Sequence, residues 1–563
     1  MRLINTATRV LEEPIGHTKP EYAILSHTWG EEEVSYKDMN SSSYVYKKGH
    51  RKIEMTCQIA AQSGIKYAWV DTCSIDKSSS AEVTEAINSM FQWYKRSKIC
   101  YVILEDLPAS ASIESLKNCR WLTRGWTLQE LIAPYHIIFF DQDWNYRGSK
   151  ADLAEQLSKI TNIGTEILLH QCSLSTISVA QRMSWAALRE TTRIEDIAYS
   201  LLGIFDVNMP LLYGEEGKAF RRLQEETIKS ISDFSIFAWK LPSDQQQEDL
   251  AQRRKVCGVL AENINAFALC GSIITDPDYE LTEFAITNLG VKTRVQVLTM
   301  TIKSERNLRY GYVLPLRCSS AEEDSLGVQL RKCGPDQFVR EDPWNLIHCA
   351  LDANTNAPRE RYLFTQLPKT EMDPRPIMNM SSFISRIRSH VLQVKCEHGF
   401  IMSDAWNWGR WDGEDDLFFV SRNTSWDSSV IRFNMNVPGE TLNLKCTFYA
   451  IRWSCLANSS FQYTLVEDQR FANSLSEIQS WLVIWNHVSL QVMQKLISYN
   501  IPKTSSIAIK CPTIQKTALI SGVANIQENT NICRNKFWRV SFSYQLLDDE
   551  FVPEIRSTTW KFW

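Results

Sequence analysis

Short apolar runs alternate with amphipathic stretches over the first 240 residues. The runs are rich in β-branched and aromatic side chains, and they predict strands at Tyr22–Ser26, Tyr67–Asp71, Ile99–Leu104 and Ile137–Phe140. Apolar residues between these runs recur at helical spacing and predict helices at 48–61, 79–94 and 127–133. Strands that alternate with helices pair in parallel and are covered by helices on both faces. We therefore predict an α/β domain with a flavodoxin-like parallel sheet.

A helical tail follows this domain, and the pattern then changes. Residues 218–230 predict the last helix of the tail, whereas short alternating runs from about Asp233 onward predict successive β-strands, the first of them at 234–239. The Pro-rich segment 369–376 is the best linker in the second half. We predict an α/β domain with its tail at 1–240, with a core at about 22–150. A mainly β region follows, as units at 241–368 and 377–563 or as one continuous unit.

Composition and charge narrow the function classes. The chain has 563 residues with 61 basic and 65 acidic side chains, so no excess of positive charge favours nucleic acid as a partner. Its 15 cysteines are odd in number and form no CxxC pair, which disfavours a disulfide framework and a metal site. We see neither a signal peptide nor a membrane span. We therefore expect a cytoplasmic protein that needs no metal and no resident cofactor.

Candidate site residues follow the predicted strands. In a parallel sheet, ligands bind beyond the carboxyl ends of the strands. Ser26, His27, Trp29 and Gly30 follow the first strand, and Asp71 ends the second. Asp71 could instead have the purely structural role of fixing the loop after its strand. Arg124, Trp126 and Glu130 stand near the start of the helix at 127–133. Arg124 and the helix start could hold a phosphate, and Trp29 or Trp126 could stack on a planar ring.

The motifs around these residues resemble those of a known family. The segments YAILSHTWG (22–30), WVDTCSIDK (69–77), AEVTEAINSMFQWY (81–94) and RGWTLQELIAP (124–134) look like the signature blocks of the fungal HET, or heterokaryon incompatibility, domain. The segment 182–226 resembles the helical tail of the same family. The resemblance implies an effector of self/non-self recognition whose activation leads to programmed cell death.

A remoter resemblance implies a reaction. The HET blocks are similar to those of TIR domains, whose NAD-cleaving members carry a catalytic glutamate in a W-C-L-x-E-L segment. Trp126 to Leu131, WTLQEL, matches that segment with Thr127 in place of the cysteine. The resemblance thus implies a TIR-like fold, Glu130 as the catalytic residue, and NAD as a candidate substrate, bound by Ser26, His27, Trp29, Gly30, Asp71, Arg124 and Trp126.

Other functions stay open on the sequence. Glu130 could instead be a salt-bridged helix residue, and the domain could be a signalling adaptor that acts only by self-association. The second half shows no readable chemistry. It could sense a protein partner or ligand, and the cluster Trp406, Trp408 and Trp411 could form a ligand-binding surface, although aromatic residues of β domains are more often buried.

Overall fold

The computed structural model describes the N-terminal part of the chain almost continuously and the second half in segments. The described residues are 1–14, 20–39, 41–242, 255–276, 281–303, 308–320, 325–349, 359–367, 378–379, 391–396, 400–405, 411–412, 417–419, 427–435, 438, 444–453, 462–467, 504–511, 515–527 and 537–548. The predicted linker 369–376 and residues Trp406 and Trp408 lie outside them, as does the side chain of Trp411.

A seven-stranded sheet forms the centre of the N-terminal domain. Its strand order is β2-β1-β4-β3-β5-β6-β7. The bounds are β1 Leu3–Asn5, β2 Leu11–Glu12, β3 Tyr22–His27, β4 Tyr67–Trp69, β5 Ile99–Ile103, β6 Ile137–Phe140 and β7 Tyr146–Ser149. The inner strands β4, β3, β5 and β6 are parallel, in the flavodoxin-like order, as the sequence predicts. The outer strands β1, β2 and β7 are antiparallel additions that the sequence analysis missed.

Helices cover both faces of this sheet. Along β3, Ala23 and Leu25 pack against α2 (His50–Gln62) on one face. Tyr22 and Ile24 face the other side, where α4 (Ser80–Arg96) and α6 (Thr127–Ile132) lie. The strand is buried along its whole length, since successive side chains point to opposite faces and both faces are covered. The side chain of Ser79 accepts the Glu82 amide and caps the start of α4, which agrees with the helix predicted at 79–94.

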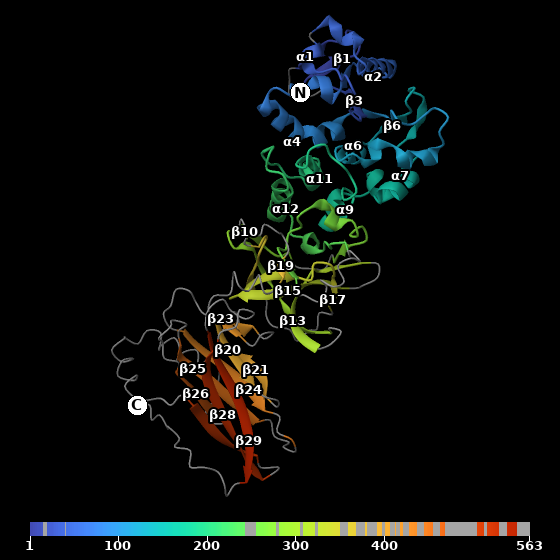
Figure 1. Ribbon diagram of the computed structural model, residues 1–563. Helices are drawn as coiled ribbons and strands as arrows, with labels where there is room; N and C mark the ends of the chain where they lie inside the picture. The colour runs from blue at the N-terminus through green and yellow to red at the C-terminus, as the bar shows by residue number, and fades with distance from the viewer. Residues whose placement is uncertain are drawn as a thin grey trace.

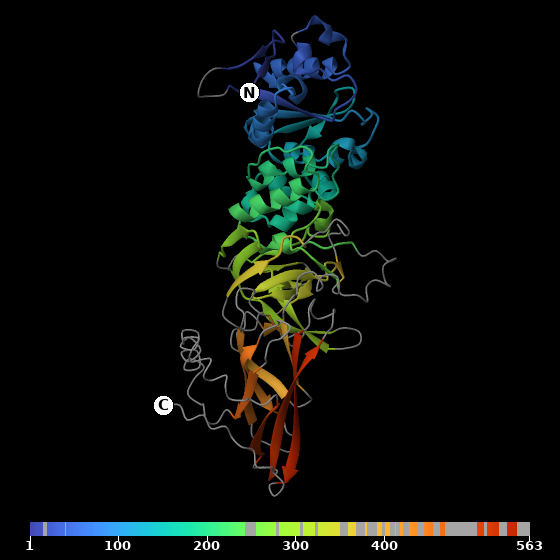
Figure 2. The same cartoon turned by 60° about the vertical axis from the view of Figure 1, so that its left-hand side comes forward.

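The helical tail packs against the α4 and α6 face. It contains α7 (Ala154–Thr161), α8 (Thr165–Leu168), α9 (Val179–Ser184), α10 (Asp196–Tyr199), α11 (Leu202–Phe205) and α12 (Lys218–Ser230), the last with the bounds that the sequence predicts. Gly203 in α11 has no room for a side chain, because a Cβ there would lie 2.0 Å from the Cβ of Phe91 in α4. Both views place this tail between the N-terminal sheet and the first strands of the β region (Figures 1 and 2).

The second half is mainly β, as predicted. Its described strands lie in sheets of ten, two, six and four strands. Their bounds run from β8 (Lys255–Cys257) through β11 (Gly290–Val295), β13 (Leu308–Pro315) and β15 (Leu326–Gly334) to β24 (Asp427–Met435), β25 (Leu444–Trp453), β28 (Lys516–Gln527) and β29 (Phe537–Asp548).

One predicted strand is wrong. Residues 234–239 are not a strand, because Phe234–Phe237 form the 3-10 helix η4. The side chain of Asp233 accepts the Ser235 amide at 2.8 Å, and this local cap turns the chain. The apolar run is buried in the core in that conformation.

Candidate functional site

The carboxyl ends of β3 and β4 and the helix α6 bring several of the predicted residues together. Ser26 and His27 are the last two residues of β3, and Asp71 begins the short helix α3 (Asp71–Ser74) after β4. Glu130 lies on α6, which packs against the end of β3. The structure therefore joins Ser26, His27, Trp29, Asp71 and Glu130 at one edge of the sheet, where parallel sheets bind their ligands.

The inner part of this edge is the contact between Ser26 and Glu130. The Ser26 hydroxyl donates a hydrogen bond to Oε2 of Glu130 and accepts one from the indole of Trp121 at 2.7 Å. Glu130 is 7% exposed. Burial raises the pKa of the Glu130 carboxyl to about 7, against the lowering effect of the Ser26 hydrogen bond. A carboxyl group with such a pKa is present in both protonation states near neutral pH, as acid and base catalysts often are.

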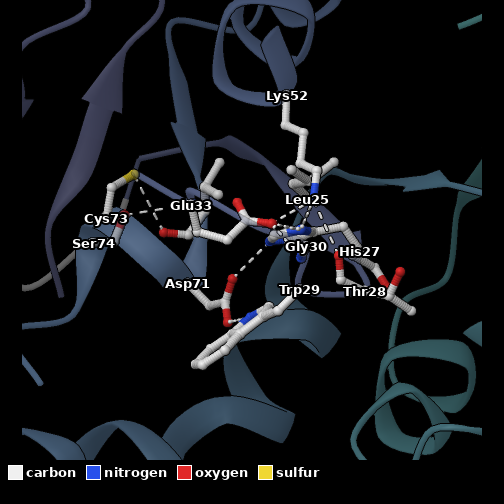
Figure 3. A network of polar contacts seen from close by, with 12 residues as sticks. Leu25, His27, Thr28, Trp29, Gly30, Glu33, Lys52, Asp71, Cys73 and Ser74 are labelled. Atoms are coloured by element: carbon white, nitrogen blue, oxygen red, sulfur yellow. Dashed lines mark hydrogen bonds and ion pairs between the residues drawn. The ribbon is translucent and has the colours of Figure 1, made fainter. Parts of the chain in front are cut away.

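The outer part of the edge is a chain of polar contacts around His27. Nε2 of His27 lies 3.0 Å from Oδ1 of Asp71, and its Nδ1 lies 3.1 Å from the ammonium of Lys52 (Figure 3). An ammonium only donates and a carboxylate only accepts, so we assign a neutral imidazole with its proton on Nε2. Both ring nitrogens are occupied. His27 therefore positions its neighbours and has no free nitrogen to act as a base.

Lys52 supplies the positive charge of the outer part. It projects from α2 and is buried, although it carries an ammonium group. The ammonium contacts carboxylate oxygens of Glu33 at 2.5 Å and Glu105 at 3.0 Å, and it donates to the carbonyl of Thr28 at 3.1 Å. Two carboxylates and a carbonyl compensate for the loss of water around this buried cation.

Asp71 and Trp29 form the rim. Asp71 is half-buried, which by itself raises its pKa, but hydrogen bonds from His27 and Trp29 and the positive charge of Lys77 bring that pKa below its ordinary value. Oδ2 of Asp71 accepts the indole N–H of Trp29 at 2.8 Å (Figure 3). The Trp29 side chain is 52% exposed and is thus held at the surface by a fixed hydrogen bond.

Gly30 stands next to Trp29 and is also exposed. Its amide donates to Oε1 of Glu33 at 2.8 Å, and a Cβ at this position would meet only the tips of flexible side chains. No steric requirement for glycine is visible here, although the amide itself helps to hold Glu33 beside Lys52.

Arg124 and Trp126 have their contacts with the helical tail. The guanidinium of Arg124 donates to the hydroxyl of Thr192 at 3.0 Å. The indole of Trp126 bonds to Asp196, whose pKa is nevertheless raised by burial. The helix α6 that follows has six residues and is too short to provide a separate anion site. Binding of a phosphate by Arg124 stays a prediction without a structural argument in its favour.

Three residues of the edge were not singled out from the sequence. Trp121 holds Ser26, Lys52 holds His27, and the buried Arg189 donates to the carbonyl of Arg124 at 2.8 Å and to the hydroxyl of Thr127 at 3.1 Å. Burial lowers the pKa of Arg189 to about 10, against the favourable charge of Glu130. A signal existed only for Lys52, a lysine one residue before Ile53 on the apolar face of a predicted helix.

Other chemistry at this edge is disfavoured. Cys73 is buried, its thiol contacts the carbonyl of Val70, and burial raises its pKa, so it does not supply a thiolate near neutral pH. In the described ranges, no three His, Cys, Asp or Glu side chains come together as a metal site would require. Within the same ranges, no helix is long and apolar enough to cross a bilayer.

A cavity of about 380 Å³ lies elsewhere, at the other end of α6. It is lined by Phe91, Lys95, Ile132, Ala133, Tyr135, Ile167, His170, Gln171, Cys172, Ser173 and Leu174. No residue that the sequence analysis selected lines this cavity, and we assign it no role in the function of the sheet edge.

Comparisons with known proteins agree with the motifs. Residues 22–113 match the family model described as Heterokaryon incompatibility protein (HET), which covers β3 to β5 but ends before Glu130. Residues 218–313 match a domain of unknown function, DUF8212, which begins at the first residue of α12 and so starts within the predicted unit 1–240. No solved structure matches the chain significantly.

A curated relative extends the match. Over 221 residues the chain is 48% identical to the vegetative incompatibility protein HET-E-1 of Podospora anserina, a stretch that covers 37% of this chain and 16% of that protein. The chain thus corresponds to only a small part of its relative. Fold, motifs and comparisons lead to one identification: the N-terminal part of this chain is a HET domain, as in the fungal incompatibility protein that it resembles.

Proposed function

We propose that this chain is an effector of heterokaryon, or vegetative, incompatibility that leads to cell death, and that its HET domain acts by cleaving NAD. The incompatibility role is supported by the match to the HET family and by the identity to a vegetative incompatibility protein. In this proposal the second half receives the signal from a partner or ligand, and the HET domain carries out the response.

The observation that carries the catalytic part is the hydrogen bond between Ser26 and Glu130. It fixes a carboxyl group at the sheet edge, on the same side as the half-exposed indole of Trp29. A carboxyl of pKa about 7 is sufficiently ionised at neutral pH to act as an anion, and its burial away from water strengthens its electrostatic effect.

One such carboxylate is sufficient for the proposed reaction. Glycosidases that cleave neutral sugars need a second carboxyl group to protonate a poor leaving group. The nicotinamide of NAD is already cationic and departs as a neutral molecule when the bond to the ribose breaks. Glu130 would stabilise the positive charge that develops on the ribose, and water would then complete the hydrolysis.

The test is release of nicotinamide from NAD by the purified full chain. We expect turnover by the wild type and a loss of at least about 100-fold in Glu130→Gln, which keeps the size and the hydrogen-bonding capacity but not the charge. Glu190→Gln replaces an exposed glutamate of the same domain and serves as the matched control. Equal turnover by Glu130→Gln and the wild type, or no turnover in any oligomeric state, would refute the catalytic role.

The burial of Glu130 favours a second candidate function. A carboxyl that is 93% covered and bonded to Ser26 could serve only to hold α6 on β3, in an adaptor that signals by self-association through its HET domain. If the domain is an adaptor, we expect a change of oligomeric state on activation. We also expect that a folded Glu130→Gln variant still induces cell death. If the domain is an enzyme, we expect this variant to be inactive in cells although it is folded.

A further inference from the structure

Trp29 is held at the rim of the sheet edge by contacts on both its backbone and its ring. Its indole N–H donates to Asp71 at 2.8 Å, and its carbonyl accepts the guanidinium of Arg120 at 3.1 Å. Figure 3 shows Asp71 between the imidazole of His27 and the indole of Trp29. The ring is therefore fixed in orientation while about half of the side chain stays accessible to solvent. An aromatic ring with these properties can bind a ligand with little further loss of side-chain conformational entropy, because the ring is already ordered.

A cation of the chain itself already occupies one face of this ring. The ammonium of Lys77 lies 3.3 Å from the centroid of the Trp29 ring, which is the shortest cation–π distance among the described residues. Among the residues that the structure describes, Lys77 makes no ion pair within 4 Å. Lys77 is an exposed residue, but partial desolvation of its ammonium lowers its pKa, against the favourable charges of Asp71 and Glu33. The ammonium is thus directed at the π face rather than at a carboxylate.

We propose that this face of Trp29 is a binding site for a cationic aromatic ring, and that the Lys77 ammonium is a resident occupant that the ligand displaces. The inference rests on the proposed function, because the nicotinamide ring of NAD is a cation of this class. Asp71 bonds to the indole N–H and makes the ring richer in electrons, so the face favours positive charge. A planar cation covers more of the ring than an ammonium does, and the flexible lysine side chain can return to solvent.

Displacement of Lys77 makes the site selective for charge. A cationic ring replaces one cation–π contact by another, whereas a neutral ring gives up the contact of Lys77 without an equivalent. Lys77 also competes with every ligand of the site and lowers its affinity. Removal of the lysine charge should therefore increase the affinity for a cationic ring by about threefold to tenfold, and the affinity for a neutral ring less.

The experiment compares two small probes of nearly the same shape on the full chain. The probes are the N-methylnicotinamide cation and neutral nicotinamide, and calorimetry measures their dissociation constants. Neither probe has a phosphate, so loss of a lysine cannot weaken their binding by removing a phosphate contact. We expect Lys77→Met to bind the cation about threefold to tenfold more tightly than the wild type does, and Lys77→Arg to bind it like the wild type.

Control variants identify the face. Lys66→Met is the matched control, since the Lys66 ammonium lies over the ring of Tyr67 at 5.2 Å and away from the edge described above. It should leave both dissociation constants unchanged, and Trp29→Leu should abolish the preference for the cation. The proposal is overturned if Lys77→Met leaves the affinity for the cation unchanged or lowers it, or if it raises the affinity for both probes equally. It is also overturned if neither the wild type nor Lys77→Met binds the cation.

These outcomes are separate from those of the proposed function. Probe binding requires no cleavage of NAD, so a chain without turnover can still show the expected change in Lys77→Met. Conversely, loss of nicotinamide release in Glu130→Gln together with an unchanged affinity in Lys77→Met would support NAD cleavage and refute the role of Lys77.

Discussion

Glu130 and Asp71 are two carboxyl groups at the same edge of the sheet, and their surroundings shift their pKa values in opposite directions. Glu130 is buried with Ser26 as its bonded donor, and burial raises its pKa to about 7. Asp71 is half-buried beside His27, Trp29 and Lys77, and these groups hold its pKa below its ordinary value. One carboxyl therefore titrates near neutral pH while the other remains ionised.

The opposite pKa shifts indicate different roles for the two carboxyl groups. A buried carboxyl group that is unstable in its ionised form is stabilised by a positive charge that develops beside it. This is the property that a catalytic group needs. A carboxylate that is already compensated by hydrogen bonds and cations instead fixes the geometry of its partners. In this edge Glu130 has the first environment, and Asp71, with Lys52 and His27, has the second.

The largest change in stability should come from removing the Lys52 ammonium, the cation in the outer part of the edge. Lys52→Met leaves the carboxylates of Glu33 and Glu105 without their common partner and is expected to lower the free energy of unfolding by about 3 kcal/mol or more. Urea denaturation of the full chain measures the change. Lys48→Met, which removes an exposed ion pair with Glu31, should leave the free energy of unfolding nearly unchanged, because solvent screens that pair. Equal effects of the two substitutions would show that Lys52 is not a buried structural cation.

The pH dependence of stability should reveal Glu130 directly. Its pKa is higher in the folded chain, about 7, than its ordinary value of 4.5, so the folded state binds more protons between these values. The stability that Glu130 contributes is complete below pH 4.5 and is lost as the pH rises through 7, by up to about 3 kcal/mol. The difference in free energy of unfolding between the wild type and Glu130→Gln should follow this curve from pH 5 to 8.5. A flat difference would contradict the raised pKa.

Ser26→Ala should shift this curve rather than remove it. The variant loses the hydrogen bond that favours the ionised carboxylate and leaves the indole N–H of Trp121 without its acceptor. We expect a destabilisation of about 1–3 kcal/mol and a midpoint of the Glu130 titration above that of the wild type. Ser78→Ala, at an exposed position bonded to Asp76, is the control. A midpoint that falls, or stays where it is, would separate Ser26 from the titration of Glu130.

The smallest effect is expected from Asp71→Asn at neutral pH. Asparagine keeps an acceptor but loses the charge, so a destabilisation of about 1 kcal/mol is expected. The sign of its pH dependence is opposite to that of Glu130, because the pKa of Asp71 is lowered in the folded chain. Its stabilising effect is present above its ordinary value of 3.8 and is lost as the pH falls through the lower value. Melting temperatures of both chains at pH 3 to 7 measure this, and an advantage of the wild type that grows toward acid would contradict it.

Much of the α/β fold followed from periodicity. The strands at 22–26, 99–104 and 137–140 were predicted to within a residue or so because each is a buried apolar run that ends in polar sequence. The edge strands β1, β2 and β7 were missed because they are short and carry little periodicity. The segment 234–239 shows the limit of such patterns, since the single side chain of Asp233 decides between a strand and a turn of helix.

The candidate site was predictable where its residues follow the strands and not where they come from elsewhere. Ser26, His27 and Asp71 could be placed at one edge because the carboxyl ends of parallel strands meet there. Glu130 was selected by a resemblance, and its bond to Ser26 depends on how α6 packs on β3. Lys52 and Trp121 reach the edge from helices on opposite faces, and Lys77 from the loop after α3, which sequence spacing does not show.

The pH profile of NAD cleavage reports the protonation of Glu130 and its catalytic role in one measurement. For the free enzyme, kcat/KM should rise between pH 5 and 8 with a midpoint near the pKa of about 7 and should be lost in Glu130→Gln. Asp71→Asn should keep this dependence on Glu130 but lower its midpoint, because the negative charge of Asp71 is one of the causes that raise the pKa of Glu130. A profile that is flat over this range, a midpoint near the ordinary carboxyl value, or full activity of Glu130→Gln would contradict a catalytic role for Glu130.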